Sequence, residues 1–188
     1  MRTAFKEWAV VVDALGHGGQ ILILRKGGLA EGRGGFRVEH ERFLFFPTLF
    51  HQQREQVVPA AQARYDEIAP TLPGPDTMRL ECFAEVVGWR KLSSLAEAER
   101  LRGQHIWRDE VIAERFDWGR EQSIHALALR VWRLPQRVER PLLPAYGGCK
   151  SWIELAEDLP TDGAIPALAD DAFAAKLAAF HAALGGAA

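Results

Sequence analysis

The sequence predicts an α+β protein with a mixed or antiparallel sheet of about four strands, packed with about five to six helices. Apolar stretches of strand length and stretches with helical periodicity follow each other without regular alternation, which argues against a doubly wound sheet. The chain has 188 residues, of which 48% are hydrophobic and 26% charged, as is typical of one globular domain. We therefore expect 1–188 to form a single domain, with the proline-rich segment 69–77 as its sub-boundary if it has one.

The first half of the chain is predicted to contain two strands and three helices. Residues 4–15 place apolar side chains at helical spacing, although three valines leave a strand as the alternative. The apolar segment 20–26 predicts a strand buried on both faces, and 36–46 predicts a second strand. Thr48 is the expected N-cap of a helix over the following ten residues. Pro59 fits the first position of the next helix, at 58–68.

The strands of the second half of the chain are predicted from apolar side chains, alternating with charged ones in the first of them, and its helices from helix-start signals or apolar stripes. Residues 79–89 alternate between apolar and charged, which predicts a strand with one wet face, and 123–134 predicts an apolar strand. Residues 135–149 contain three prolines and are expected to be a loop. Capping boxes or apolar stripes predict helices at 94–103, 106–118 (beginning near Arg108), 151–159 and 170–184.

A glycine-rich segment, RKGGLAEGRGG at 25–35, follows the first apolar strand. It holds five glycines together with Arg25, Lys26, Glu31 and Arg33. A phosphate-binding P-loop would need lysine and a hydroxyl residue where this chain has Arg33 and Gly34, so that motif is excluded. The alternative is that the glycines simply turn a charged hairpin.

Polar residues in and around this segment form the candidate site. If 20–26 and 36–46 pair as a hairpin with the glycines at its tip, the cations of both strands come together, near the free N–H groups of a helix that begins at Thr48. An imidazole with a pKa near neutrality suits proton transfer, which makes His40 and His51 the catalytic candidates. The anion-binding candidates are Arg25, Lys26, Arg33, Thr48 and Gln52. Glu31 and Glu39 are the candidates for holding a divalent cation.

Several classes of protein are excluded by what the sequence lacks. No apolar run approaches the roughly 20 residues of a membrane span, so no membrane association is expected. Cys82 and Cys149 are isolated and have no metal-binding spacing, which predicts reduced thiols in a cytoplasmic protein.

The chain also resembles a known bacterial family. The matching words are Lys6-Glu7-Trp8-Ala9, Leu24-Arg25-Lys26-Gly27-Gly28, His40 with Phe43, Phe46-Pro47-Thr48 and His51-Gln52. These words, and the later Trp107 and LALRVWRL, are similar to the family known only as domain of unknown function eighteen-oh-two. The resemblance covers most of the chain and implies a stand-alone bacterial protein. It implies no activity, but it singles out the polar residues Lys6, Glu7, Arg25, Lys26, His40, Thr48, His51 and Gln52.

Three functions are compatible with these patterns. The first is a protein that handles nucleic acid or a phosphorylated small molecule at the glycine-rich loop, as a hydrolase or without chemistry, with a divalent cation as a candidate cofactor. The second is a non-catalytic module that binds nucleic acid or nucleotides, with a second half whose order is similar to small barrel domains and whose strand ends in Arg130, Trp132 and Arg133. The third is a protein–protein scaffold that uses its acidic C-terminal helix.

Overall fold

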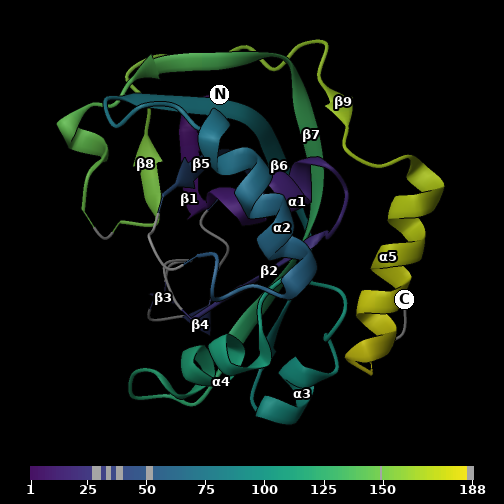
Figure 1. Ribbon diagram of the computed structural model, residues 1–188. Helices are drawn as coiled ribbons and strands as arrows, with labels where there is room; N and C mark the ends of the chain where they lie inside the picture. Colours follow the sequence, from purple (N-terminus) through teal and green to yellow (C-terminus); the bar gives the residue numbers. More distant parts are fainter. Residues whose placement is uncertain (27–30, 33–34, 37–39, 50–52, 149, 186–188) are drawn as a thin grey trace.

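A computed structural model describes residues 1–26, 31–32, 35–36, 40–49, 53–148 and 150–185, without the side chains of 31–32 and 35–36. The described chain forms a seven-stranded mixed sheet in the order β2-β7-β6-β5-β1-β8, with β9 also paired to β7 (Figure 1). Five α-helices and two short 3₁₀ helices surround the sheet. The predicted α+β class is confirmed, and the sheet is larger than the sequence indicated.

The elements have the following bounds. The strands of the main sheet are β1 (Thr3–Trp8), β2 (Leu22–Arg25), β5 (Arg42–Thr48), β6 (Thr77–Leu92), β7 (Ile124–Pro141), β8 (Trp152–Glu154) and β9 (Ile165–Pro166). The pair β3 (Glu31–Gly32) and β4 (Gly35–Phe36) makes a separate two-stranded sheet. The helices are α1 (Ala9–Gly16), α2 (Pro59–Ile68), η1 (Ala69–Thr71), α3 (Leu95–Glu99), α4 (Asp109–Asp117), η2 (Pro144–Tyr146) and α5 (Asp170–Ala183).

Strands β1 and β5 run parallel in the middle of the sheet, and both of their faces are buried. Phe5, Phe43 and Phe45 point into one apolar cluster, whereas Ala4, Leu44 and Phe46 point into another. This arrangement explains why the segments read as continuous apolar runs, since strands buried on both faces do not alternate with polar residues. The ends of these two strands lie side by side, with Trp8 opposite Thr48.

The two long strands β6 and β7 are interior strands of the sheet, between β2 and β5. Their pairing shifts register between Leu80 and Cys82 and again between Val86 and Gly88. Such bulges bend a strand and increase its twist. The paired strands arch over one end of the molecule, above α1 and α2 (Figure 1).

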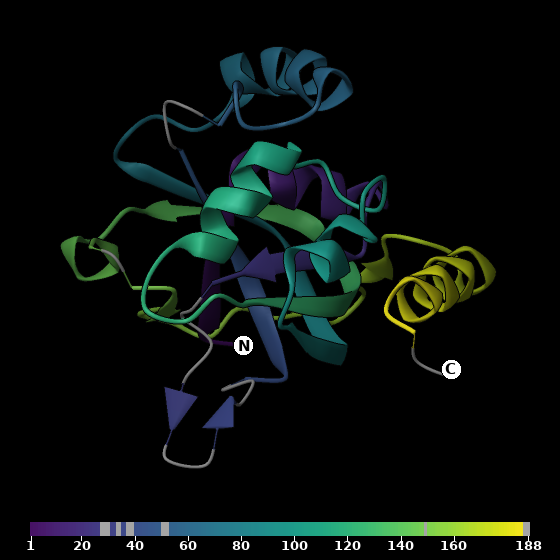
Figure 2. The same cartoon turned by 90° about the horizontal axis from the view of Figure 1, so that it is seen from below.

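The C-terminal helix α5 lies apart from the other helices, beside β7 and β9, in both views of the molecule (Figure 2). Arg130 of β7 ties it to the sheet, because its Nη2 donates to Asp170 Oδ1 at 2.6 Å and its Cζ lies 4.5 Å from the Phe173 ring centroid. The helix predicted at 170–184 is confirmed.

Other predictions of local structure are confirmed where local signals are strong. The capping box that begins with Ser94 is present at the start of α3, with hydrogen bonds in both directions between Ser94 and Glu97. Pro59 occupies the first turn of α2. Helix α4 begins after Arg108, as predicted. The strand predicted at 20–26 contains β2, the one predicted at 79–89 lies within β6, and the one predicted at 123–134 covers the first part of β7.

The prediction of a single helix over 4–15 is wrong in its first half. Residues Thr3–Trp8 form β1, and the helix begins only at Ala9. Strand β1 lies between β5 and β8, and its backbone N–H and C=O groups form hydrogen bonds with these two neighbouring strands.

The predicted hairpin between 20–26 and 36–46 is also wrong. Strand β2 pairs with β7, whereas β5 pairs with β1 and β6. The second predicted strand corresponds to β4 and β5, which belong to different sheets. Within the main sheet, β7 and β6 therefore lie between β2 and β5, and the two strands are not joined across a turn.

The helix expected to begin at Thr48 is absent from the described residues 48–49 and 53–58, since Thr48 is the last residue of β5 and Gln53–Gln56 form turns.

Two predictions of local structure in the last third of the chain are wrong as well. The expected loop 135–149 begins as strand, because β7 continues to Pro141 opposite β6. The helix expected at 151–159 contains strand β8, where Thr3 pairs with Glu154 and Phe5 with Trp152. A capping box is a local signal, and pairing with β1 overrides it.

Candidate functional site

The ends of β1 and β2 meet at a buried carboxylate. The Glu7 side chain is 0% exposed, and its Oε1 accepts the Trp8 backbone N–H at 2.8 Å. Its Oε2 lies 3.4 Å from Nη1 of Arg25, the last residue of β2. The Arg25 guanidinium also donates from Nη2 to Ser151 Oγ at 3.0 Å and lies 4.7 Å from the Phe5 ring centroid. Arg25 is therefore held in place from three directions while its side chain remains 20% exposed.

A second guanidinium reaches the same place from α4. Arg115 lies between two indole rings, with its Cζ 4.7 Å from the Trp8 centroid and 4.9 Å from the Trp107 centroid. Its Nη1 donates to the Leu24 carbonyl oxygen at 3.0 Å. Burial lowers the pKa of Arg115 to about 10, Glu7 opposes that decrease and Arg25 adds to it. At neutral pH two guanidinium ions thus face one carboxylate, and this centre carries a net positive charge.

Thr48 closes the centre from the end of β5. Its Oγ1 donates to the Glu7 carbonyl oxygen at 3.1 Å, and its own carbonyl oxygen accepts from Gln53 Nε2 at 2.6 Å. The hydroxyl therefore ties β5 to β1, and does not cap a helix. We call Glu7, Arg25, Thr48, Arg115 and Ser151 the strand-end cluster.

His40 lies beside this cluster. Its imidazole contacts the Trp152 ring edge-on, with centroids 4.9 Å apart, and Trp152 in turn lies 4.6 Å from Phe5. Arg25 contacts Ser151 and Phe5, so the two predicted residues both reach the surface formed by Phe5, Ser151 and Trp152. The structure thus joins Arg25 and Thr48 through Glu7, whereas His40 precedes β5, lies at the opposite end of that strand from Thr48 and contacts Trp152.

Lys26 points elsewhere. Its ammonium donates to the carbonyl oxygens of Phe116 at 2.8 Å and Ser123 at 3.0 Å, and also to that of Glu121. These three acceptors match the three hydrogens of an ammonium group. Lys26 thereby binds the C-terminal end of α4, where unpaired carbonyls and the helix dipole favour a cation.

The other predicted site residues cannot be placed in this cluster. Arg33, Glu39, His51 and Gln52 lie outside the described residues, and of Glu31 the backbone position on β3 is described without its side chain. Among the described residues, no group of three or more His, Cys, Asp or Glu side chains is placed to hold a metal ion. The proposed metal and histidine roles of these residues stay predictions.

Sequence reasoning missed Arg115, Ser151 and Trp152. A signal for Arg115 exists, because Val111, Ile112 and Phe116 form the buried face of α4 and a residue at position 115 shares that face. No comparable signal marks Ser151 and Trp152, since the pairing of β8 with β1 brings them here.

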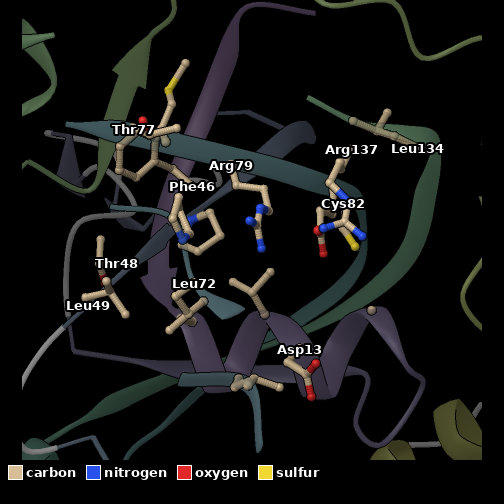
Figure 3. A pocket seen from close by; sticks show the side chains of 18 of the residues that line it. Asp13, Phe46, Thr48, Leu49, Leu72, Thr77, Arg79, Cys82, Leu134 and Arg137 are labelled. Carbon is tan, nitrogen blue, oxygen red and sulfur yellow. The ribbon is translucent and has the colours of Figure 1, made fainter. Parts of the chain in front are cut away.

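A groove of about 1600 Å³ adjoins the strand-end cluster. It lies between α1, α2 and η1 on one side and the outer halves of β6 and β7 on the other, and the ends of β1 and β5 contribute Lys6, Phe46 and Thr48. Figure 3 shows Arg79 and Arg137 reaching into the groove from the strand side, with Asp13 of α1 opposite. Lys6 donates from Nζ to the Gly148 carbonyl oxygen at 3.0 Å.

The groove has a surplus of positive charge. Among the described residues it is lined by the carboxylates Asp13 and Glu81 and by five cationic side chains, which are Lys6, Arg64, Arg79, Arg133 and Arg137. Arg64 is fully engaged, since it binds Asp13 through two nitrogens at 2.8 and 2.9 Å and Glu67 through the third. Arg79 donates to Glu139 at 2.9 Å and to the Thr71 carbonyl oxygen at 2.6 Å, which holds the segment 69–77 against β6.

Cys82 lies in the floor of the groove, and burial raises the pKa of its thiol to about 12. A Cβ added at Gly16 would lie 2.8 Å from Cys82 Sγ, so α1 and β6 approach closely here. The thiol is therefore protonated at neutral pH and acts as a packing group.

The described residues thus form an α+β fold with two adjoining regions of positive charge. The sequence profile described as "Domain of unknown function (DUF1802)" matches residues 4–179, and the chain belongs to this family. No curated protein matches the chain. Among the helices of the described residues, none has the length and apolar character to cross a membrane.

Two solved structures resemble the chain weakly. The crystal structure of ASCH from Zymomonas mobilis has a TM-score of 0.46 and 10% sequence identity, and covers 82% of this chain and 87% of its own. That of a single-residue mutant of the same protein has a TM-score of 0.45 and 12% identity, and covers 82% of this chain and 90% of its own. A similarity of this degree does not bear on function.

Proposed function

We propose that the protein binds nucleic acid or a phosphate ester at the surface next to the strand-end cluster. The observation that carries this proposal is the excess of guanidinium over carboxylate, since Glu7 is shared by Arg25 and Arg115. Arg25 is fixed by Glu7, Ser151 and Phe5 before any ligand arrives, and a pre-organised guanidinium loses little entropy on binding. Its planar group suits the paired oxygens of a phosphate.

His40 supplies the candidate for proton transfer. Its ring lies against Trp152, whose chain neighbour Ser151 accepts a hydrogen bond from Arg25, so the imidazole and the fixed cation contact adjacent residues. That pairing suits phosphoester cleavage, in which charge develops on the non-bridging oxygens. The roles of His51, Arg33, Gln52, Glu31 and Glu39 in the same site remain proposals from the sequence.

Binding without chemistry is the second candidate. The cationic and aromatic character of the surface supports recognition of phosphates and bases whether or not His40 transfers a proton. The two candidates predict the same binding behaviour and differ only in turnover.

Binding is tested with fluorescently labelled RNA and DNA of about eight nucleotides, in the range of single-strand binding modules. We expect the logarithm of the binding constant to fall linearly with the logarithm of salt concentration. Arg25→Lys keeps the charge but loses the planar guanidinium that can bind two phosphate oxygens at once, and it should weaken binding. Arg100→Gln, at the exposed end of α3, is the control and should not weaken binding. Affinity that ignores salt would contradict the proposal.

Turnover is tested with bis(p-nitrophenyl) phosphate and with the same oligonucleotides. Loss of hydrolysis in His40→Ala with unchanged binding would support the enzymatic candidate. Salt-dependent binding with no hydrolysis by the wild-type protein, with and without added magnesium, would support the binding module.

A further inference from the structure

An unusual bulge in β7 forms one rim of the groove. Cys82 pairs with Arg133, and Leu80 pairs with Val138, so the four residues 134–137 lie opposite the single residue Glu81. Pro135 within this bulge cannot donate to a strand ladder, which explains why the pairing is interrupted here. The bulge turns Arg137 toward the groove, as Figure 3 shows. Bulges of this kind commonly re-aim side chains beside functional sites.

The guanidiniums of Arg133 and Arg137 have no hydrogen bond or ion pair to any described residue, and both residues are exposed. Elsewhere on the groove the arginines are engaged, as Arg64 is by Asp13 and Glu67. Two guanidiniums without partners on a concave surface are available to an anion.

Exposed apolar side chains are concentrated on the same groove. Of the seven large hydrophobic residues that are exposed among the described residues, four line it, and these are Leu49, Leu142, Leu143 and Ile165. They do not gather at one end. Ile165 is the pairing partner of Arg133, Leu49 follows Thr48 at the end of β5, and Leu142 and Leu143 follow β7 beyond the bulge.

We propose that this groove binds a single-stranded nucleic acid segment that continues from the ligand at the strand-end cluster. The inference rests on the proposed function and names the form of its substrate. Phosphates of the strand contact Arg133 and Arg137, and the apolar faces of the bases pack against the exposed aliphatic side chains of the groove. The groove meets the strand-end cluster at Thr48, which belongs to both.

The distribution of charge selects this ligand over a smaller one. Arg133 and Arg137 belong to the same bulged segment and offer sites for two phosphates, and Ile165, the pairing partner of Arg133, places an exposed apolar side chain beside them. The volume of about 1600 Å³ also exceeds the roughly 300–1,000 Å³ of small-molecule pockets. A ligand that repeats a phosphate and a flat apolar group fits both observations.

The test compares the double variant Arg133→Gln/Arg137→Gln with Arg100→Gln, using labelled single-stranded RNA and DNA of about eight nucleotides, a duplex of the same sequence and a mononucleotide. For the single strands, the slope of log affinity against log salt should decrease in magnitude by about 0.7 per lost phosphate contact. Glu81→Gln removes the carboxylate opposite the bulge and should strengthen binding. Arg100→Gln should behave like the wild type.

The outcomes separate this inference from the proposed function. Binding of single strands that weakens in the double variant, with mononucleotide binding unchanged, supports the groove. Oligonucleotide binding that Arg25→Lys weakens and the double variant leaves unchanged overturns the groove and keeps the proposed function. Binding that the double variant weakens and Arg25→Lys does not affect overturns the proposed function at the strand-end cluster and, with it, the continuation of the strand from the cluster into the groove. Preference for the duplex, or no binding at all, overturns the groove.

Discussion

The strand-end cluster and the groove are both positive, yet their charges are arranged in opposite ways. In the cluster, Arg25 and Arg115 are engaged by a buried carboxylate, a hydroxyl, backbone oxygen and aromatic rings. In the groove, Arg133 and Arg137 have no such partners among the described residues. The cluster thus fixes Arg25 in place before a ligand arrives and leaves 20% of its side chain exposed, whereas the groove keeps guanidiniums that have no partner among the described residues. The two regions therefore differ in how far their cations are pre-organised, and not in the sign of their charge.

The largest expected effect is the loss of the buried carboxylate. Glu7→Gln leaves Arg25 and Arg115 beside a neutral amide, and we expect it to lower the free energy of unfolding by about 4 kcal/mol, as for one removed partner of a buried ion pair. Urea denaturation measures the change. Glu114→Gln on the exposed face of α4 is the control and should stay within about 0.5 kcal/mol of the wild type. A small change in the free energy of unfolding for Glu7→Gln would mean that Arg25 and Arg115 depend on Glu7 no more than the groove arginines depend on internal partners.

The stability of the protein should depend on pH through His105, a buried residue that packs against Trp107. His105 lies against Trp107, with centroids 5.6 Å apart, and its buried Nδ1 has no hydrogen-bond partner among the described residues. Burial lowers the pKa of His105 to about 4 from an unfolded value of 6.5. Between those values the unfolded chain binds more protons, so stability falls as pH decreases, by about 3 kcal/mol in total from this group.

The His105 effect is isolated by comparing wild type with His105→Gln in urea at pH values from about 4 to 7, which span the titration of histidine in the two states. The variant lacks the titrating group, so its stability should depend less on pH in that window. Parallel profiles would contradict a buried neutral imidazole. Carboxylates titrate in both proteins and cancel in the difference.

A smaller effect should distinguish Lys26 from the groove arginines. Lys26→Met removes a cation that donates to three carbonyl oxygens, at the end of α4 and in the segment that follows. We expect a loss of about 2 kcal/mol in stability, as for a hydrogen-bonded charged group. The salt dependence of oligonucleotide binding should not change. A weaker salt dependence of binding in Lys26→Met would indicate that Lys26 contacts the ligand's phosphates, as the sequence predicted.

Local signals predicted elements well where nothing distant competed with them. The capping box at Ser94, the proline at the start of α2 and the apolar stripe of α5 act within one turn of the chain, and those helices are present. The same kind of signal failed at 151–159, because β8 found a partner in β1. Helical spacing failed at residues 4–8 for the same reason.

In the candidate site too, the sequence identified some of the residues, whereas long-range strand pairing decided where they lie. The sequence nominated Arg25, His40 and Thr48. Arg25 and Thr48 both contact Glu7, although the expected hairpin does not form and no helix begins at Thr48, whereas His40 lies at the other end of β5 against Trp152. Arg25 and Thr48 meet because the ends of β1, β2 and β5 converge around Glu7. The sequence also nominated Lys26, whose ammonium reaches α4 instead.

By itself the sequence determined the α+β class, the helices with strong end signals, the buried strands and the family, since these depend on composition, local geometry and matching residues. Tertiary structure alone decided which cations are satisfied and which remain available. Whether a guanidinium meets a carboxylate depends on strand order and register, and both follow from burying two faces of one sheet at once. Residues that are 126 positions apart then share a hydrogen bond, as Arg25 and Ser151 do, and no local pattern in the sequence indicates that contact.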